Sequence, residues 1–169
     1  PTGLDGFETE PVPHAVAKSY VGNDVNADTY GLELSANWRP TDTWRLRGTY
    51  TYTEIQLEKE TDQPLIYGGD VEGKSPEQMA SLRSLWKPVR KVEIDARLRF
   101  VDRLEALDIP SYFEGDLRLA YKPRDGLEIS LAGRNLFDSS HAEFAQLNFL
   151  GKETAEVERS VYGRITWRF

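Results

Sequence analysis

Apolar and polar residues alternate along one segment of this chain after another, and this period of two restricts its fold more than any other feature. In residues 91–100 every second residue is apolar and every residue between them is charged. Successive side chains of a strand point to opposite faces, so such a segment presents one apolar and one charged face. Apolar residues at helical spacing form no convincing run. The sequence therefore predicts an all-β, antiparallel fold.

Further segments alternate in the same way, although less completely. They cover residues 30–38, 44–52, 78–86, 113–121, 127–131 and 161–169. With 91–100 they predict about seven strands, most of roughly ten residues, which is the length that a tilted strand needs to cross a bilayer. A turn at Gly22-Asn23-Asp24 would add an eighth strand.

The predicted strands are joined by links that alternate in length. Short links, each with a proline, occupy residues 39–43, 87–90 and 122–126, and long links occupy 57–76, 103–110 and 138–156. Each short link begins with the base and proline of a recurring triplet of an aromatic residue, a base and a proline: Trp38-Arg39-Pro40, Trp86-Lys87-Pro88 and Tyr121-Lys122-Pro123. Short turns on one side and long loops on the other are typical of outer-membrane barrels, with the short turns in the periplasm.

Alternation alone does not separate a membrane barrel from a soluble β-sandwich, because strands of a sandwich also have one buried face. The large aromatic residues decide for the barrel, since they lie at strand ends on the short-turn side: Trp38, Trp44, Trp86, Tyr121 and Trp167. Amphipathic rings concentrate at membrane interfaces, so we interpret this set as a periplasmic aromatic girdle. A soluble sandwich that binds a ligand stays open as an alternative, as does a small stand-alone outer-membrane barrel with a structural or adhesive role.

Composition excludes several other classes. Hydrophobic residues make up 39% and charged residues 29%, and no run approaches the roughly 20 apolar residues of a membrane-spanning helix. The net charge is −7 with bases scattered among acids, which argues against a nucleic-acid partner. The chain has no cysteine, so it has neither disulfides nor thiolate metal ligands. Residues 1–13 lack the features of a signal peptide, so we expect this chain to be an internal or C-terminal part of a longer protein.

Few residues suggest a catalytic or metal-binding site. His141 and Glu143 stand two apart, but two ligands do not complete a metal site, and we expect no metal, no cofactor and no catalytic set. We therefore predict that the chain is not an enzyme. The long loop at 57–76 is the candidate for contact with an extracellular substrate, around its tip at Tyr67, Gly68, Gly69 and Asp70.

Three stretches resemble the C-terminal part of the barrel of TonB-dependent receptors. They are Thr29–Leu34 together with Trp38-Arg39-Pro40 and residues 44–47, then Gly133–Asp138, and the ending Arg159–Phe169. The resemblance covers roughly residues 15–169. It implies a barrel of about 22 strands around an N-terminal plug, in the outer membrane of a Gram-negative bacterium. It also implies import of a scarce nutrient such as a ferric siderophore or cobalamin.

The same resemblance implies the partners and the division of the chain. The partners are outer-membrane lipid, the remainder of the barrel, the plug domain, the barrel-assembly machinery and the TonB complex. The sequence contains no plug and no TonB box, so we expect the TonB complex to act through an N-terminal part outside it. Residues 1–14 are expected to form an extracellular loop segment, and 15–169 the C-terminal portion of the barrel, with 15–28 extending its first strand outward.

Two further expectations concern side chains. Ile165, Trp167 and Phe169 resemble the C-terminal signal that the barrel-assembly machinery recognises, although Phe169 could equally be one more girdle aromatic. The charged faces of the strands are expected to point into the lumen, where ion pairs and water satisfy them, because a charge facing lipid at mid-depth costs about 2–4 kcal/mol.

Overall fold

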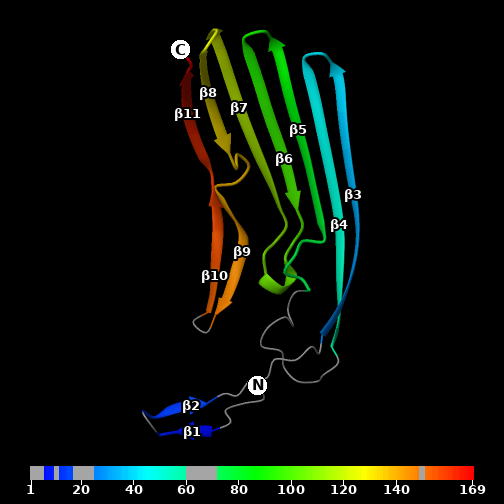
Figure 1. Ribbon diagram of the computed structural model, residues 1–169, viewed down its shortest axis with the longest axis vertical. Coiled ribbons are helices and arrows are strands. Elements are labelled where there is room, and N and C mark those ends of the chain that lie inside the picture. Colours follow the sequence, from blue (N-terminus) through cyan, green and yellow to red (C-terminus); the bar gives the residue numbers. More distant parts are fainter. Residues whose placement is uncertain (1–5, 10–11, 17–24, 60–71, 149–150) are drawn as a thin grey trace.

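Seven strands form one antiparallel sheet in the computed structural model, which describes residues 6–9, 12–16, 25–59, 72–148 and 151–169 (Figure 1). Their order in the sheet is β11-β8-β7-β6-β5-β4-β3. They are β3 (Val25–Thr41), β4 (Trp44–Lys59), β5 (Gln78–Val89), β6 (Val92–Val101), β7 (Tyr112–Arg124), β8 (Leu127–Arg134) and β11 (Ser160–Trp167). This confirms the predicted antiparallel sheet of seven strands. The turn considered at residues 22–24 lies outside the described residues.

Two short sheets and one helical turn complete the described chain. β1 (Gly6–Glu8) pairs with β2 (His14–Val16), and β9 (Ser140–Asn148) pairs with β10 (Gly151–Glu158). A 3-10 turn, Glu105–Leu107, lies in the link between β6 and β7. Among the described residues, no helix has the length and apolar character that crossing a bilayer requires.

The β9–β10 hairpin adds two strands that the sequence does not predict to the long link at residues 138–156. The hairpin continues beyond the ends of β8 and β11, on the side of the sheet that carries the long links (Figure 1). Its strands escaped detection because apolar residues do not keep to one face. In β9 the adjacent residues Phe144 and Ala145, which point to opposite sides, are both apolar, so no clean alternation marks the strand.

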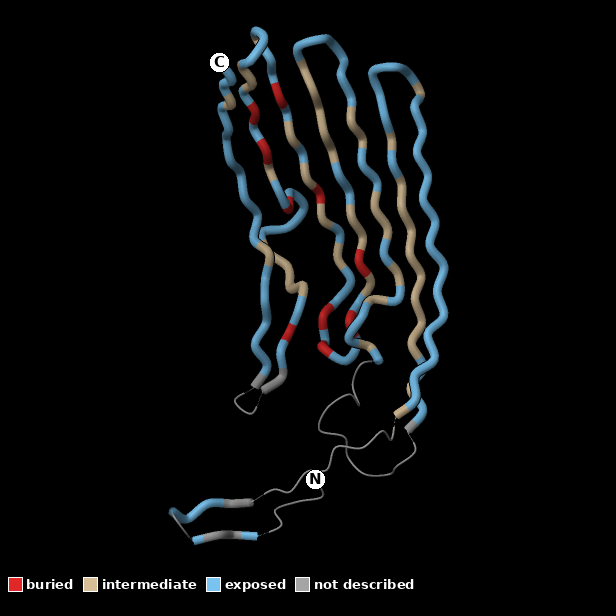
Figure 2. The backbone as a smooth tube through the Cα atoms, viewed as in Figure 1, coloured by how far each residue is buried: buried red, intermediate tan, exposed pale blue. Residues whose placement is uncertain are grey.

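The register of the sheet gathers the apolar residues on one face. Residues directly opposite each other in neighbouring strands share a face. One such row of paired residues crosses the sheet and consists of Trp44, Trp86, Ile94, Leu119, Leu131 and Gly163. The other rows on this face are also mainly apolar. Leu32 is 53% exposed, Leu119 44% and Ile165 73%, so they share no dry interior, and Figure 2 shows buried residues only at scattered points. The largest buried apolar cluster in the described chain is small and comprises Leu104, Leu107, Ile109 and Ala145.

The recurring aromatic-base-proline triplets occupy shifts of register. Pairing is interrupted between Trp38 and Thr41, between Trp86 and Val89, and between Tyr121 and Arg124. Each proline falls inside one of these shifts, where its missing N–H breaks no ladder hydrogen bond. The triplet therefore ends regular pairing just before each tight turn, at the same end of the sheet in all three hairpins.

Backbone hydrogen bonds join neighbouring hairpins at this end. The N–H of Lys87 donates to the carbonyl of Thr43 at 2.8 Å, and that of Lys122 donates to the carbonyl of Lys91 at 2.8 Å. The N–H of Arg168 donates to the carbonyl of Gly126 at 2.7 Å. The short-turn end is thus a continuous bonded rim, whereas the opposite end carries the longer links.

Candidate functional site

The charged face of the sheet is the candidate functional surface, and it is built from the residues that alternate with the apolar ones. Arg83 donates two hydrogen bonds to Asp95, from Nε at 2.9 Å and from Nη2 at 2.6 Å. Arg118 lies between Glu93, at 3.1 Å, and Glu128. Each of these pairs joins adjacent strands, so the ion pairs cross-link the face. This is the ladder of mixed charge that the sequence predicts.

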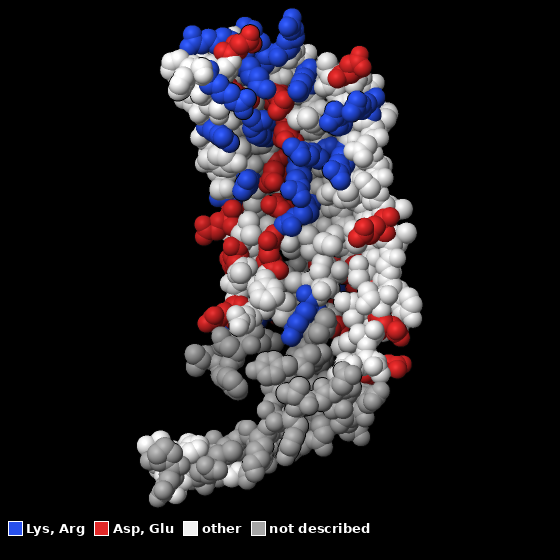
Figure 3. Space-filling model, viewed as in Figure 1, with Lys and Arg blue, Asp and Glu red and all other residues white. Residues whose placement is uncertain are grey.

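Other cations on this face have no carboxylate within salt-bridge distance among the described residues. They are Arg45, Arg47, Arg97, Arg134 and Arg164. Arg47, Arg97 and Arg134 line one depression of about 520 Å³, together with Arg83 and Arg118. Two carboxylates, Asp95 and Asp116, share that lining, so the depression carries a surplus of positive charge. Figure 3 shows the basic side chains gathered over the short-turn half of the sheet, with a central stripe of acidic side chains between them.

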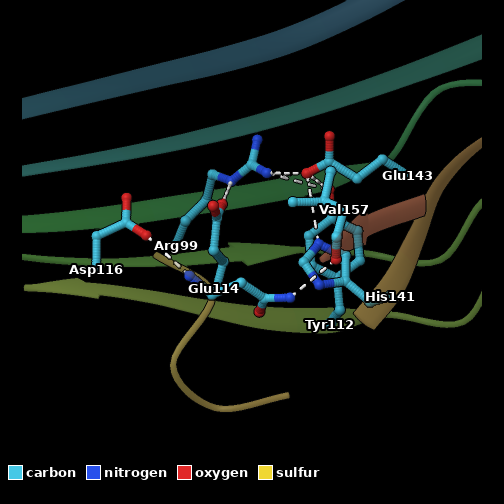
Figure 4. Close-up of polar contacts among 8 residues, drawn as sticks. Arg99, Tyr112, Glu114, Asp116, His141, Glu143 and Val157 are labelled. Atoms are coloured by element: carbon cyan, nitrogen blue, oxygen red, sulfur yellow. Dashed lines mark hydrogen bonds and ion pairs between the residues drawn. The ribbon is translucent and has the colours of Figure 1, made fainter. Parts of the chain in front are cut away.

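A second polar cluster joins the β9–β10 hairpin to this face (Figure 4). Arg99 of β6 donates from Nε to Glu114 of β7 at 2.7 Å and from Nη2 to Glu143 of β9. The hydroxyl of Tyr112 also donates to Glu143, at 3.2 Å, and the Tyr112 ring stacks on His141 with centroids 4.1 Å apart. Strands β6, β7 and β9 therefore meet at the carboxylate of Glu143. We call these five residues the hairpin latch.

Asn135 forms a second attachment for the hairpin. It follows β8, has a positive φ of 50°, and is fully buried. Its backbone N–H donates to Asp116 at 3.2 Å, and its side-chain amide donates to the carbonyl of Val157 in β10 at 3.0 Å. Asparagine tolerates this left-handed conformation better than most residues. Its position in the Gly133–Asp138 stretch is therefore explained by the corner that the chain turns there.

The latch keeps Glu143 ionised. Burial of the carboxyl opposes ionisation, but the charge of Arg99 and the hydrogen bonds from Arg99, Tyr112 and His141 outweigh that effect and lower the pKa of Glu143 below its ordinary value. His141 and Glu143 do lie together, with Nε2 and Oε1 3.5 Å apart. The carboxylate is already occupied by Arg99, and the described residues contain no cluster of three His, Asp or Glu that could hold a metal.

The aromatic residues predicted as a girdle all lie on the apolar face at the short-turn end, and all are exposed: Trp38, Trp44, Trp86, Tyr121 and Trp167. Trp44 and Trp86 are direct cross-strand partners, and the indole of Trp44 donates to Ser84 at 2.9 Å. Phe169 is exposed and contacts Trp167 edge to face at 6.5 Å between centroids. The role of these rings at a membrane interface stays a prediction.

Other predicted positions are not tested by the structure. The candidate substrate positions, Tyr67, Gly68, Gly69 and Asp70, lie outside the described residues. Conversely, the latch was missed as a unit, since Tyr112, Glu114 and Arg99 carry no motif and His141 and Glu143 were considered only as metal ligands. The one signal in the sequence is the pair of polar residues His141 and Glu143, two positions apart in the long link at 138–156.

Comparison with known proteins gives one family and several relatives. A family model described as "TonB dependent receptor-like, beta-barrel" matches residues 3–136. A probable TonB-dependent siderophore receptor, PiuA of Acinetobacter baumannii, is 27% identical over 125 residues, which are 66% of this chain and 17% of that protein. The ferrioxamine B receptor of Salmonella typhimurium is 28% identical over 159 residues, 84% of this chain and 21% of that protein. The chain thus spans about a fifth of the length of these relatives.

Solved structures share the fold. The siderophore receptor PiuA from A. baumannii superposes with a TM-score of 0.69 at 23% identity, over 83% of this chain and 22% of that one. The ferric-catecholate import receptor Fiu from E. coli K12 superposes with a TM-score of 0.67 at 18% identity, over 98% of this chain and 24% of that one. At these identities the superpositions speak for the architecture alone.

Proposed function

Because this chain belongs to the TonB-dependent receptor-like β-barrel family, we propose that it forms part of the barrel wall of an outer-membrane importer of ferric siderophores in a Gram-negative bacterium. The observation that carries the proposal is the two-faced sheet, with an exposed apolar face and an ion-paired polar face. A soluble protein that exposed this many large apolar side chains would aggregate, whereas a barrel wall presents them to lipid.

In this proposal the short turns lie in the periplasm and the long links outside the cell. The orientation follows from the lengths of the links, since outer-membrane barrels carry their short turns in the periplasm. The exposed aromatic rings at the short-turn end support a membrane interface there, since such rings prefer the headgroup level. Residues 1–14 would then belong to an extracellular segment, and residues 15–169 to the C-terminal portion of the barrel. Ile165, Trp167 and Phe169 lie at the periplasmic end, where the barrel-assembly machinery would recognise them.

The siderophore class comes from the relatives, whose names specify siderophores and ferrioxamine B. Cobalamin, the other nutrient class considered from the sequence, has no such support. On this chain we propose that the loop around Tyr67–Asp70 takes part in recognition, because loops carried on a rigid barrel commonly supply ligand contacts. The family is one of receptors and transporters, and in line with this we propose no catalysis.

The charged face would point into the lumen, toward the plug domain. Arg47, Arg97 and Arg134 line a depression that is not neutralised by its own carboxylates, so we propose that acidic groups of the plug meet it. The edge strands β3 and β11 each have one neighbour in the described sheet, and the remaining barrel strands would pair with their free edges. Energy would come from the TonB complex acting through the plug.

The test is uptake by the full-length protein. We would express it in a strain that lacks its own siderophore receptors and measure growth on iron bound to hydroxamate or catecholate siderophores. We expect growth on at least one of them, lost when the TonB complex is deleted. Growth on none, or growth that persists without TonB, would contradict the proposal.

The depression on the inner face has its own test in the same assay. Arg47→Glu with Arg97→Glu should lower uptake and weaken retention of the plug in the barrel, while Arg103→Glu, at the long-loop end of the sheet, serves as the control. Unchanged uptake in the double variant would show that the plug does not bind at this depression.

A further inference from the structure

An apolar groove of about 590 Å³ lies on the outer face of β6, β7, β8 and β11. Its apolar lining comes from Val92, Leu119, Tyr121, Ile129, Leu131 and Ile165. Val92 follows a short turn directly, and Tyr121 belongs to the aromatic set at the short-turn end. The groove is therefore close to one rim of the sheet and not at mid-height.

One position in the lining of the groove, Gly163, has no side chain. Gly163 pairs with Leu131, which pairs with Leu119, so a row of leucines ends at a glycine in β11. A Cβ at Gly163 would meet only a backbone oxygen at 3.9 Å, an ordinary contact. Packing among the described strands thus does not demand glycine there, and the described residues leave the space above Gly163 open.

Two cations stand at the rim end of the groove. The guanidinium of Arg124 lies over the ring of Trp167, 5.7 Å from its centroid. Trp167 is on the same face as Ile165, two residues further toward the rim, or about 7 Å along the strand. Lys91 lies in the short turn before β6, and its Nζ donates to the carbonyl of Pro123 at 2.8 Å, which places it at the rim next to Arg124. Within the described part of the chain, neither cation has a carboxylate at salt-bridge distance.

We propose that this groove is a specific site for an anionic glycerophospholipid of the periplasmic leaflet. One acyl chain would lie over Gly163 between the aliphatic walls, and the headgroup phosphates would bind Arg124 and Lys91. Arginine and lysine bind phosphate through charge-assisted hydrogen bonds, and the aromatic ring beneath Arg124 holds its charge at headgroup level. The inference rests on the proposed function, because that function places the sheet in the outer membrane. It goes further in proposing that a defined groove binds one lipid and selects it by charge.

The experiment uses the purified full-length receptor in detergent and native mass spectrometry. The probes are dioleoyl phosphatidylglycerol, which is anionic, and dioleoyl phosphatidylcholine, which has no net charge. We expect at least about fivefold more phosphatidylglycerol retained on the receptor, because both lipids offer a phosphate but phosphatidylcholine also brings a choline cation, which Arg124 and Lys91 repel. The double variant Arg124→Gln with Lys91→Gln should remove that preference, and Gly163→Leu should lower retention about fivefold by filling the groove.

The matched control is Gly48→Leu, on the outer face of β4, where a Cβ also meets only a backbone oxygen at 3.9 Å. It should retain the lipid as the unmodified receptor does. The proposal would be overturned if the receptor retained the two lipids equally, or if Gly48→Leu and Gly163→Leu lost the same amount of lipid. It would also be overturned if inorganic phosphate displaced the lipid, or if the receptor formed a dimer in place of the lipid adduct. Siderophore uptake is measured on the same variants: its failure in the unmodified receptor contradicts the proposed function, whereas loss of lipid preference with uptake intact supports the lipid site.

Discussion

Placing one charge on the apolar face at mid-depth tests the assignment of the two faces with a calculable cost. Leu98 of β6 is 39% exposed and pairs with Leu82 and Gly115. It lies six residues beyond Val92 along the strand; at about 3.4 Å per residue and a tilt near 40°, this is about 15 Å along the membrane normal. An apolar band about 25 Å tall has its middle at about half that height, so Leu98 falls within a few ångströms of the midplane.

Leu98→Arg should therefore lower the free energy of unfolding by about 2–4 kcal/mol, which is roughly a 30- to 900-fold change in the folding equilibrium. Val92→Arg, near the interface, should cost only about 0–1 kcal/mol because the charge reaches water. Ser35→Arg should also be tolerated. Its cross-strand row passes through Thr49, Ser81 and Arg99 to Glu114, so Ser35 lies on the polar face, opposite to that of Leu98.

The assay is denaturant unfolding of the full-length receptor in phosphatidylcholine bilayers, with Leu98→Gln to separate the loss of the leucine from the gain of charge. Outer-membrane abundance in cells gives a second readout. If Leu98→Arg costs no more than Val92→Arg or Ser35→Arg, lipid does not cover this face and the reasoning fails.

Three further predictions concern the two ends of the sheet. The latch lowers the pKa of Glu143, so the contribution of its carboxylate to hairpin docking should be complete above the ordinary pKa of 4.5 and be lost as pH falls through the lower folded-state pKa. Distances between spin labels on the hairpin and on the sheet, measured against pH, check this. Glu143→Gln should abolish the pH dependence. Gly126→Ala should cost about 1–3 kcal/mol, seen as a lower Tm, because φ is 77° and the new Cβ would clash with the carbonyl oxygen of Arg168. Deleting Phe169 should lower the outer-membrane level of the receptor on quantitative immunoblots, and normal assembly would count against its role as a signal.

The sheet could be predicted from the sequence because its information is local. The charged alternation from Lys91 to Phe100 defines both faces of β6, and the prolines at 40, 88 and 123 mark three turns. Neighbouring strands follow one another along the chain, so pairing β3 through β8 needs no choice among distant partners.

The remaining features depend on contacts that no local pattern records. β11 pairs with β8 across an inserted hairpin, and that hairpin is held by Arg99 and Glu143, which are 44 residues apart. The burial of Asn135 depends on Val157 in the same way. Its left-handed backbone conformation leaves no trace in the hydrophobic periodicity, although the residue lies within the Gly133–Asp138 motif.

The most direct test of the account places nitroxide spin labels one at a time at positions 93–98 of the full-length receptor in lipid bilayers. Collision with oxygen, which concentrates in lipid, is compared with collision with a water-soluble nickel chelate. The account predicts that oxygen dominates at positions 94, 96 and 98 and that the chelate gains at 93, 95 and 97. Equal values at successive positions, or the reverse pattern, would contradict the assignment of the apolar face to lipid and the charged face to the lumen.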